Sequence, residues 1–330
     1  MANSNPAYPL QQYATGAQDA LALKEFGGLV LGAYPTLTTI SQFTRKQTIT
    51  QGQSYQFPAT WKSTADYHVA GTTLTGVNEP QVEERIITLD TQELISHVYE
   101  DKFTEFVQHY SLRAERAVQA ANAIARKIDQ FTFATAINGA RQVARGTGSV
   151  FPAGNLLTTP RTGAAATAYP MTEAGSLLLQ ADIREIGRKM REKDCPVSMG
   201  VCFLSPYLHD VLIMDTKLSS RDWQGGQNDL LKGRVTMCSG FMIMQSNLIP
   251  STAVTGSLNS NYDGDFSLTK AVLIGDISSA IGEISYGGIT PFGPDWIPAN
   301  RAHLLGASIL QGRKWLRPEA LGEITTTVTG

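Results

Sequence analysis

The chain has 330 residues, of which 42% are hydrophobic and 17% charged, so it can bury a sizeable core in one large domain or two ordinary ones. Its formal net charge is -2 with Lys and Arg scattered along the chain, which argues against a nucleic-acid-binding tail or a membrane-binding patch. Cys195, Cys202 and Cys238 form no C-x-x-C pair, and no apolar run is long enough to span a membrane. We therefore expect no metal, no cofactor and no membrane contact.

The first 20 residues are polar and lack both the basic start and the apolar segment of a secretory signal. This composition predicts a cytosolic protein. It also predicts a segment that orders only against a partner.

Residues 45–90 alternate in polarity at both ends and are rich in Thr, Gln and Gly between them. The ends predict two β-strands joined by a long polar return that has too few large apolar side chains for a core of its own. An isolated two-stranded ribbon is marginal in water, so we interpret it as an arm that lies on a neighbouring subunit. The alternative, a sheet edge packed within its own domain, stays open.

The later part of residues 100–139 predicts a long amphipathic helix, with Asn138-Gly139 as its C-terminal stop. Arg113 and Arg116 lie off the apolar stripe, where neighbours could reach them. The stripe consists of Val118, Ala121, Ile124, Ala125, Ile128, Phe131 and Thr135.

Residues 145–170 predict a loop and a domain boundary, because they are rich in Gly, Pro and Thr. Beyond it, Thr172 can cap a helix that buries Leu179, Ile183, Ile186 and Met190. Ser205-Pro206 opens a second helix. The strand candidates are "MGVCFLS", "GFMIMQSNLI", "KAVLIGD" and "AIGEISYGG". The pattern predicts a compact α/β unit over 150–290.

The stretch "GRKWLRPEALGEI" near the chain end combines Trp315 and Arg317 with Pro318, which would stop any helix arriving from residue 303. This predicts a docked segment rather than a frayed end. It returns apolar material to the part of the chain before residue 150, so one domain interrupts another.

No motif predicts catalysis. The string "RGTGSVFPAG" has Phe151 where a dinucleotide fingerprint needs its third glycine. Cys202 and His209 could form a cysteine hydrolase pair, but Cys202 lies in an apolar strand, which favours a core thiol. Asp263 and Asp265 are a fragment of a calcium loop, and a polar turn is the better interpretation. The histidines occur singly.

Five stretches together resemble the major capsid proteins of short-tailed, autographivirus-type bacteriophages, which have the Hong Kong 97-type shell fold. They are "ALKEFGGLVLGAY", "YQFPATW", "YHVAG", "ERIITLDTQELISHVYEDKFTEFVQHYSLRAE" and "GRKWLRPEALG". The resemblance implies an α+β fold with an N-terminal arm (1–44), an extended loop (45–91), a peripheral domain with a spine helix (92–149 and 291–330) and an axial domain (150–290).

Our hypothesis is that the extended loop of one subunit overlies the peripheral domain of its neighbour. We therefore expect inter-subunit contacts from loop residues to basic residues of the next copy. The expected contact residues are Trp61, Lys62, Tyr67, Glu79, Glu83, Glu84, Arg113 and Arg116. Arg317 and Glu319, with Trp315 and Pro318, are expected to hold the chain end beside the spine helix.

The resemblance implies a virion capsid of hexamers and pentamers, assembled in the bacterial cytoplasm around double-stranded DNA that it contacts weakly. It also implies a scaffolding protein, a portal at one vertex and a possible decoration protein. Two alternatives stay open: an encapsulin-like cargo compartment and the Cys202/His209 hydrolase.

Overall fold

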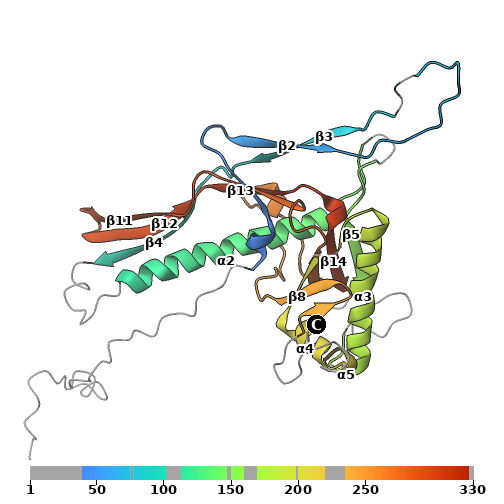
Figure 1. Ribbon diagram of the computed structural model, residues 1–330. Coiled ribbons are helices and arrows are strands. Elements are labelled where there is room, and N and C mark those ends of the chain that lie inside the picture. The colour runs from blue at the N-terminus through green and yellow to red at the C-terminus, as the bar shows by residue number, and fades with distance from the viewer. Residues whose placement is uncertain are drawn as a thin grey trace, which may run out of the picture.

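The computed structural model describes residues 39–74, 76, 78–101, 113–146, 150–159, 169–197, 200–219 and 235–326. The molecule is elongated, with an α/β unit at one end, a small sheet at the other and a long hairpin that projects past the body (Figure 1). The predicted α+β class is confirmed. Within the described ranges, no helix combines the length and the apolar character that crossing a bilayer would need.

Helix α2 (Arg113–Ala140) runs along the molecule and joins its two ends (Figure 1). Its middle packs Ile124 and Ile128 under a three-stranded antiparallel sheet, against Ala307 and Ile309 of that sheet. The sheet has the order β11-β12-β4, formed by β11 (Thr290–Ile297), β12 (Ala302–Ile309) and β4 (Leu94–Asp101). The helix therefore has the amphipathic character that its sequence predicts, although Val118 is exposed.

Helix α2 ends at Ala140, one residue beyond the predicted stop at Asn138-Gly139, so Gly139 lies in the last turn rather than after it. A Cβ at Gly139 would lie 2.4 Å from Leu321 Cδ1 and 2.8 Å from Trp315 Cβ, so the glycine serves close packing instead. The Asn138 amide donates to two backbone carbonyls of the segment 261–263.

The α/β unit contains a six-stranded sheet in the order β5-β14-β9-β6-β8-β7. Helices α3 (Glu173–Glu192), α4 (Pro206–Ile213) and α5 (Thr216–Ser219) belong to the same unit. The predicted caps are confirmed, with Thr172 accepting from the Gly175 N–H and Ser205 from the Leu208 N–H. The strands are β5 (Asn155–Thr159), β6 (Gly200–Leu204), β7 (Met237–Cys238), β8 (Phe241–Gln245), β9 (Thr269–Ile274) and β14 (Leu321–Thr326).

Two features of this sheet differ from the expectation. Residues 155–159, predicted as loop, form the edge strand β5, because the buried Asn155 amide donates to the carbonyl oxygens of Glu319 and Leu321 and so fixes β5 beside β14. The chain end itself supplies β14, which lies between β5 and β9.

A third sheet joins the two ends of the molecule, in the order β1-β10-β13. It is formed by β1 (Arg45–Thr48), β10 (Ile281–Ser285) and β13 (Gln311–Trp315). The sequence pattern places β10 in the α/β unit, but β10 pairs with β1 and β13 instead. Short 3-10 turns complete the described part: η2 (Ile40–Phe43), η5 (Ser260–Tyr262) and η6 (Pro318–Ala320).

Candidate functional site

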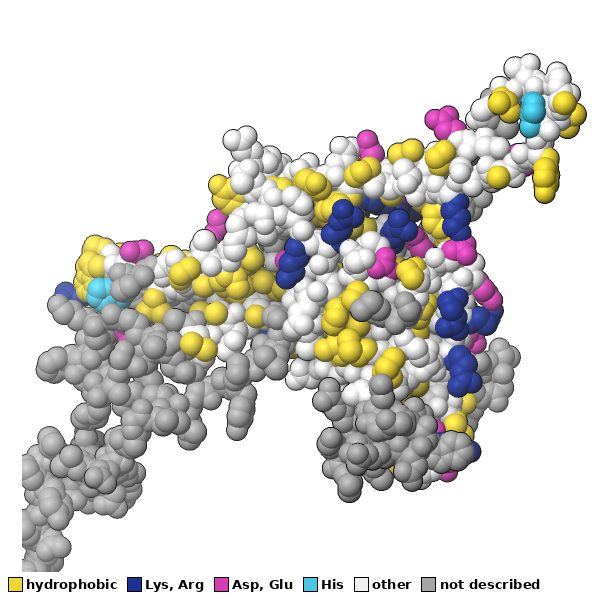
Figure 2. Space-filling view, in the orientation of Figure 1, with side chains coloured by type: hydrophobic (Ala, Val, Ile, Leu, Met, Phe, Trp, Pro, Cys, Tyr) yellow, Lys and Arg dark blue, Asp and Glu magenta, His cyan; other side chains and the backbone are white. Residues whose placement is uncertain are grey.

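The projecting hairpin is the most distinctive surface feature. Strands β2 (Ser54–Thr60) and β3 (Val82–Thr88) pair antiparallel along their whole length, and a hydrogen bond from Trp61 N to Gln81 O, 3.0 Å long, extends the pairing. Beyond it the loop extends past the body (Figure 1) and carries hydrophobic side chains on its surface (Figure 2). Tyr67, Val69 and Leu74 there are 103%, 67% and 80% exposed. We call residues 62–80 the tip.

The base of the hairpin, in contrast, has a small core of its own on the body. The members of this cluster are Ile49, Phe57, Ile87, Leu89, Ile284 and Leu316. Two glycines let the hairpin approach the third sheet: a Cβ at Gly312 would lie 2.0 Å from Thr88 O, and one at Gly282 would lie 2.5 Å from Ile87 Cδ1. The base thus packs on its own subunit, whereas Tyr67, Val69 and Leu74 of the tip remain exposed.

Trp315 marks the point where the hairpin meets the chain end. It is buried, and the guanidinium carbons of Arg85 and Arg145 lie over its ring, 4.7 Å and 4.4 Å from the centroid. Glu83 faces both cations, with N···O distances of 2.8 Å to Arg85 and 3.8 Å to Arg145. Burial lowers the pKa of Arg145, and Glu83 opposes this shift.

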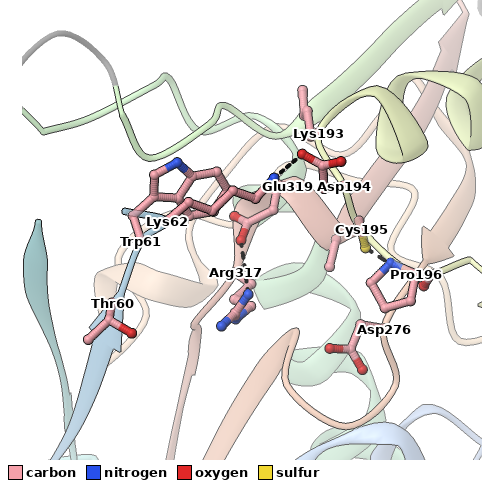
Figure 3. A pocket seen from close by; sticks show the side chains of 11 residues that line it. Thr60, Trp61, Lys62, Lys193, Asp194, Cys195, Pro196, Asp276, Arg317 and Glu319 are labelled. Carbon is pink, nitrogen blue, oxygen red and sulfur yellow. Dashed lines mark hydrogen bonds and ion pairs between the residues drawn. The ribbon is translucent and has the colours of Figure 1, made fainter. Parts of the chain in front are cut away.

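A pocket of about 280 Å³ lies beneath the point where the tip begins (Figure 3). Trp61 and Lys62 of the hairpin border it on one side, and the turn after α3 on the other. Lys62 forms an ion pair with Asp194 across this pocket, on an exposed surface where such pairs contribute about 0.2–1 kcal/mol. Burial raises the pKa of Glu319 at the floor of the pocket, and nearby cations, Arg317 first, oppose the shift.

The predicted chain-end residues lie together, but not all in the predicted role. Arg317 is half-exposed and its Nη1 lies 3.7 Å from Glu319 Oε1, so this pair joins near neighbours in the chain. Pro318 begins η6, as a residue without an N–H can. Trp315 lies against α2 at Gly139.

A bidentate ion pair that no sequence motif indicated links the end of α2 to β14. The Arg141 guanidinium, just after the helix, donates Nε and Nη2 to the two carboxylate oxygens of Glu323 in β14, at 2.6 Å and 2.7 Å. Glu323 is fully buried and also accepts from Thr269 Oγ1. Its partner is 182 positions away in the chain, so no local pattern could have identified the pair.

The predicted acidic and basic contact residues differ in their exposure and in whether they form ion pairs within their own chain. Glu79 and Glu84 are exposed, whereas Glu83 has partners in its own chain. Arg116 pairs with the buried Glu100, 3.1 Å away. The Arg113 side chain lies outside the described residues.

Cys202 and His209 do not resemble a catalytic pair. Cys202 is fully buried in β6, and burial raises the pKa of its thiol well above the ordinary value, which disfavours the thiolate nucleophile. His209 is buried in α4 and its pKa is lowered by burial. The carboxylate of Asp263 accepts from Ser257 N and Oγ, and that of Asp265 from Ser267 N, as polar turns do.

The predicted N-terminal arm lies almost wholly outside the described residues. Its last part packs on α2, where the buried carboxylate of Asp129 accepts hydrogen bonds from the backbone N–H groups of Thr39 and Ser41. The chain is thus anchored at residue 39 against the middle of the helix.

Three comparisons relate the chain to known proteins. A family model described as Gp10A-like major capsid protein matches residues 56–287. The major capsid protein of Escherichia phage T7 is 30% identical over 120 residues, which are 35% of this chain and 34% of that protein. The minor capsid protein of the same phage is also 30% identical over 120 residues, or 29% of its length. The match thus spans about a third of these curated relatives.

Solved structures extend the likeness to the whole fold. The capsid structure of the cyanophage P-SCSP1u has a TM-score of 0.80 and 26% identity, covering 99% of this chain and 100% of that one. The mature capsid of bacteriophage PhiM1 has a TM-score of 0.75 at 19% identity, with 92% of each chain covered. None of these findings supports a cargo compartment or a cysteine hydrolase.

Proposed function

Because this chain belongs to the Gp10A-like family of major capsid proteins, we propose that its copies associate as hexamers and pentamers into the icosahedral shell of a tailed bacteriophage. The shell encloses double-stranded DNA. The likeness to phage capsid structures over nearly the whole chain supports this role. The protein is structural in this role, and its surfaces matter more than any pocket.

The observation that carries the proposal is that two exposed apolar surfaces lie at opposite ends of one elongated subunit (Figure 1). One is the hairpin tip with Tyr67 and Leu74. The other is the face of the β11-β12-β4 sheet away from α2, where Ile95 and Tyr99 are 49% and 48% exposed. A single chain cannot bring them together, so each must meet another copy. Head-to-tail contacts of this kind generate rings when the rotation that relates neighbouring copies returns to the first copy after a whole number of subunits.

A deletion of residues 60–76 tests the proposal. We expect a soluble subunit that unfolds cooperatively, because the base keeps its own apolar cluster, but forms no closed shells in negative-stain microscopy. Point variants refine the test: Tyr67→Ser and Leu74→Ser should reduce shell yield, whereas Leu177→Ser, which changes a 53% exposed leucine near the start of α3, should not. Normal shells from the deletion variant would refute the role of the tip.

Charged contacts are a weaker part of the interface. Glu79 and Glu84 remain exposed and available to a basic neighbour such as Arg113 of the next copy. Each exposed pair contributes about 0.2–1 kcal/mol, so many repeated contacts would have to hold the shell. Glu83 and Arg116 contribute less to this proposal, since each has a partner within its own chain.

The remaining partners follow from the family. We propose assembly in the bacterial cytoplasm with a scaffolding protein, a portal at one vertex and a decoration protein on the outside. The net charge of -2 supports only weak contact with the enclosed DNA, because strong binding would require many cations on phosphates. Retention of free subunits on a DNA column at physiological salt would contradict this.

A further inference from the structure

Apart from the exposed ion pair between Lys62 and Asp194, the hairpin is supported by its own subunit at two separate places. The first is the apolar base on β10 and β13. The second is the crossover into the α/β unit, where Arg145 and Phe151 pair through two backbone hydrogen bonds of 2.9 Å and 2.8 Å. We call this pair of residues the bridge.

Both sides of the bridge lie against the hairpin. The Phe151 ring centroid lies 6.0 Å from that of Trp61, the last paired residue of the ladder before the tip. Next to Arg145, Gly146 has a φ of +83°, and a Cβ there would lie 3.0 Å from the side-chain oxygen of Gln81. The bridge therefore lies beneath the hairpin between its base and its tip.

An arginine is not needed at position 145 for packing alone. Its Nε and Nη2 are buried and have no hydrogen-bond partner among the described residues. Desolvating a cation with incomplete hydrogen bonding is unfavourable, and a Met or Leu side chain would fill the same space. An arginine adds direction, because its rigid planar group can lie over the Trp315 ring and reach Glu83 of β3 at the same time.

We propose that Arg145 is a positioning residue that fixes the angle at which the β2–β3 hairpin leaves its own subunit. Without it the hairpin keeps its base on β10 and β13 but pivots there, so the tip samples many directions. The role rests on the proposed function, because the angle matters only when the tip must meet a neighbouring copy. A curved closed shell tolerates a narrow range of such angles.

Distance measurements between spin labels test this directly. One label is placed at Val82, where the paired strands meet the tip, and the other at Ser251 on the body, both exposed, while the native cysteines are buried. In the unassembled wild-type chain we expect one narrow peak in the distribution of label-to-label distances. In Arg145→Met this distribution should become broad. Amide exchange over 82–88 should accelerate about tenfold, the factor that corresponds to about 1.4 kcal/mol.

Three further variants separate positioning from stability. Glu83→Gln keeps the guanidinium over the ring but removes its carboxylate, and should broaden the distribution as well; Arg145→Lys should restore the peak only in part. Ile186→Val, in the core of the α/β unit, lowers stability but should leave the peak narrow. If Arg145→Met and Glu83→Gln both keep the wild-type peak, the inference is wrong.

The same samples distinguish this inference from the proposed function. Shells are counted by electron microscopy, and Arg145→Met should shift the population from closed shells to open or irregular ones. If the wild type forms no shells, the proposed function fails, while the distance distribution of the unassembled chain still decides whether Arg145 positions the hairpin.

Discussion

The close contact between the hairpin base and β13 gives the sharpest prediction, which concerns Gly312→Ala. Judged locally, this change should stabilise the strand by about 0.5–1 kcal/mol, because alanine loses less backbone entropy than glycine on folding. The tertiary structure predicts the opposite sign. The new Cβ would lie 2.0 Å from the carbonyl oxygen of Thr88 and 2.9 Å from its carbonyl carbon, well inside ordinary contact. Both atoms belong to the backbone, so no rotamer change relieves the clash.

Overpacking of this kind typically costs about 1–3 kcal/mol, so we expect a net loss of about 1–2 kcal/mol in the free energy of unfolding. At about 2–4 °C per kcal/mol the melting temperature should fall by several degrees in calorimetry. Gly288→Ala is the matched control, since a Cβ added at Gly288 would meet nothing within 4 Å. A melting temperature for Gly312→Ala equal to or above that of the wild type would refute the reasoning.

Three other outcomes are expected. Arg141→Met leaves the fully buried Glu323 without its cation and should cost about 3–5 kcal/mol in urea denaturation. Burial raises the pKa of Glu319 above 4.5, so the folded chain holds this proton more tightly than the unfolded chain and the wild type loses stability as the pH rises through the window above 4.5. The difference in melting temperature between Glu319→Gln and the wild type should grow in favour of the variant across that pH window and stay constant above it. A difference that does not change with pH would contradict this. Cys202, whose thiol pKa is raised by burial, should react with a thiol reagent only after unfolding, and rapid labelling of the native chain would count against its place in the core.

The sequence by itself determined those elements whose signals are local. Helix α3 could be predicted with its cap at Thr172 and its buried face from Leu179 to Met190, because apolar spacing and capping residues lie within a few positions of one another. The same holds for β6 and for the paired ends of the hairpin. The tip could be recognised as a surface without a core from its composition alone.

Only the tertiary structure decided which of these elements lie together. Strand β14 could have paired with several partners, and β10 looks like any other strand of the α/β unit, since strand patterns encode burial but not the identity of the neighbour. Gly139 has the local pattern of a helix end and instead lets Trp315 and Leu321 approach the helix. Arg141 with Glu323, and Arg145 over Trp315, join residues far apart in the chain. Such contacts depend on where the backbone returns in space, and no window of sequence contains both partners.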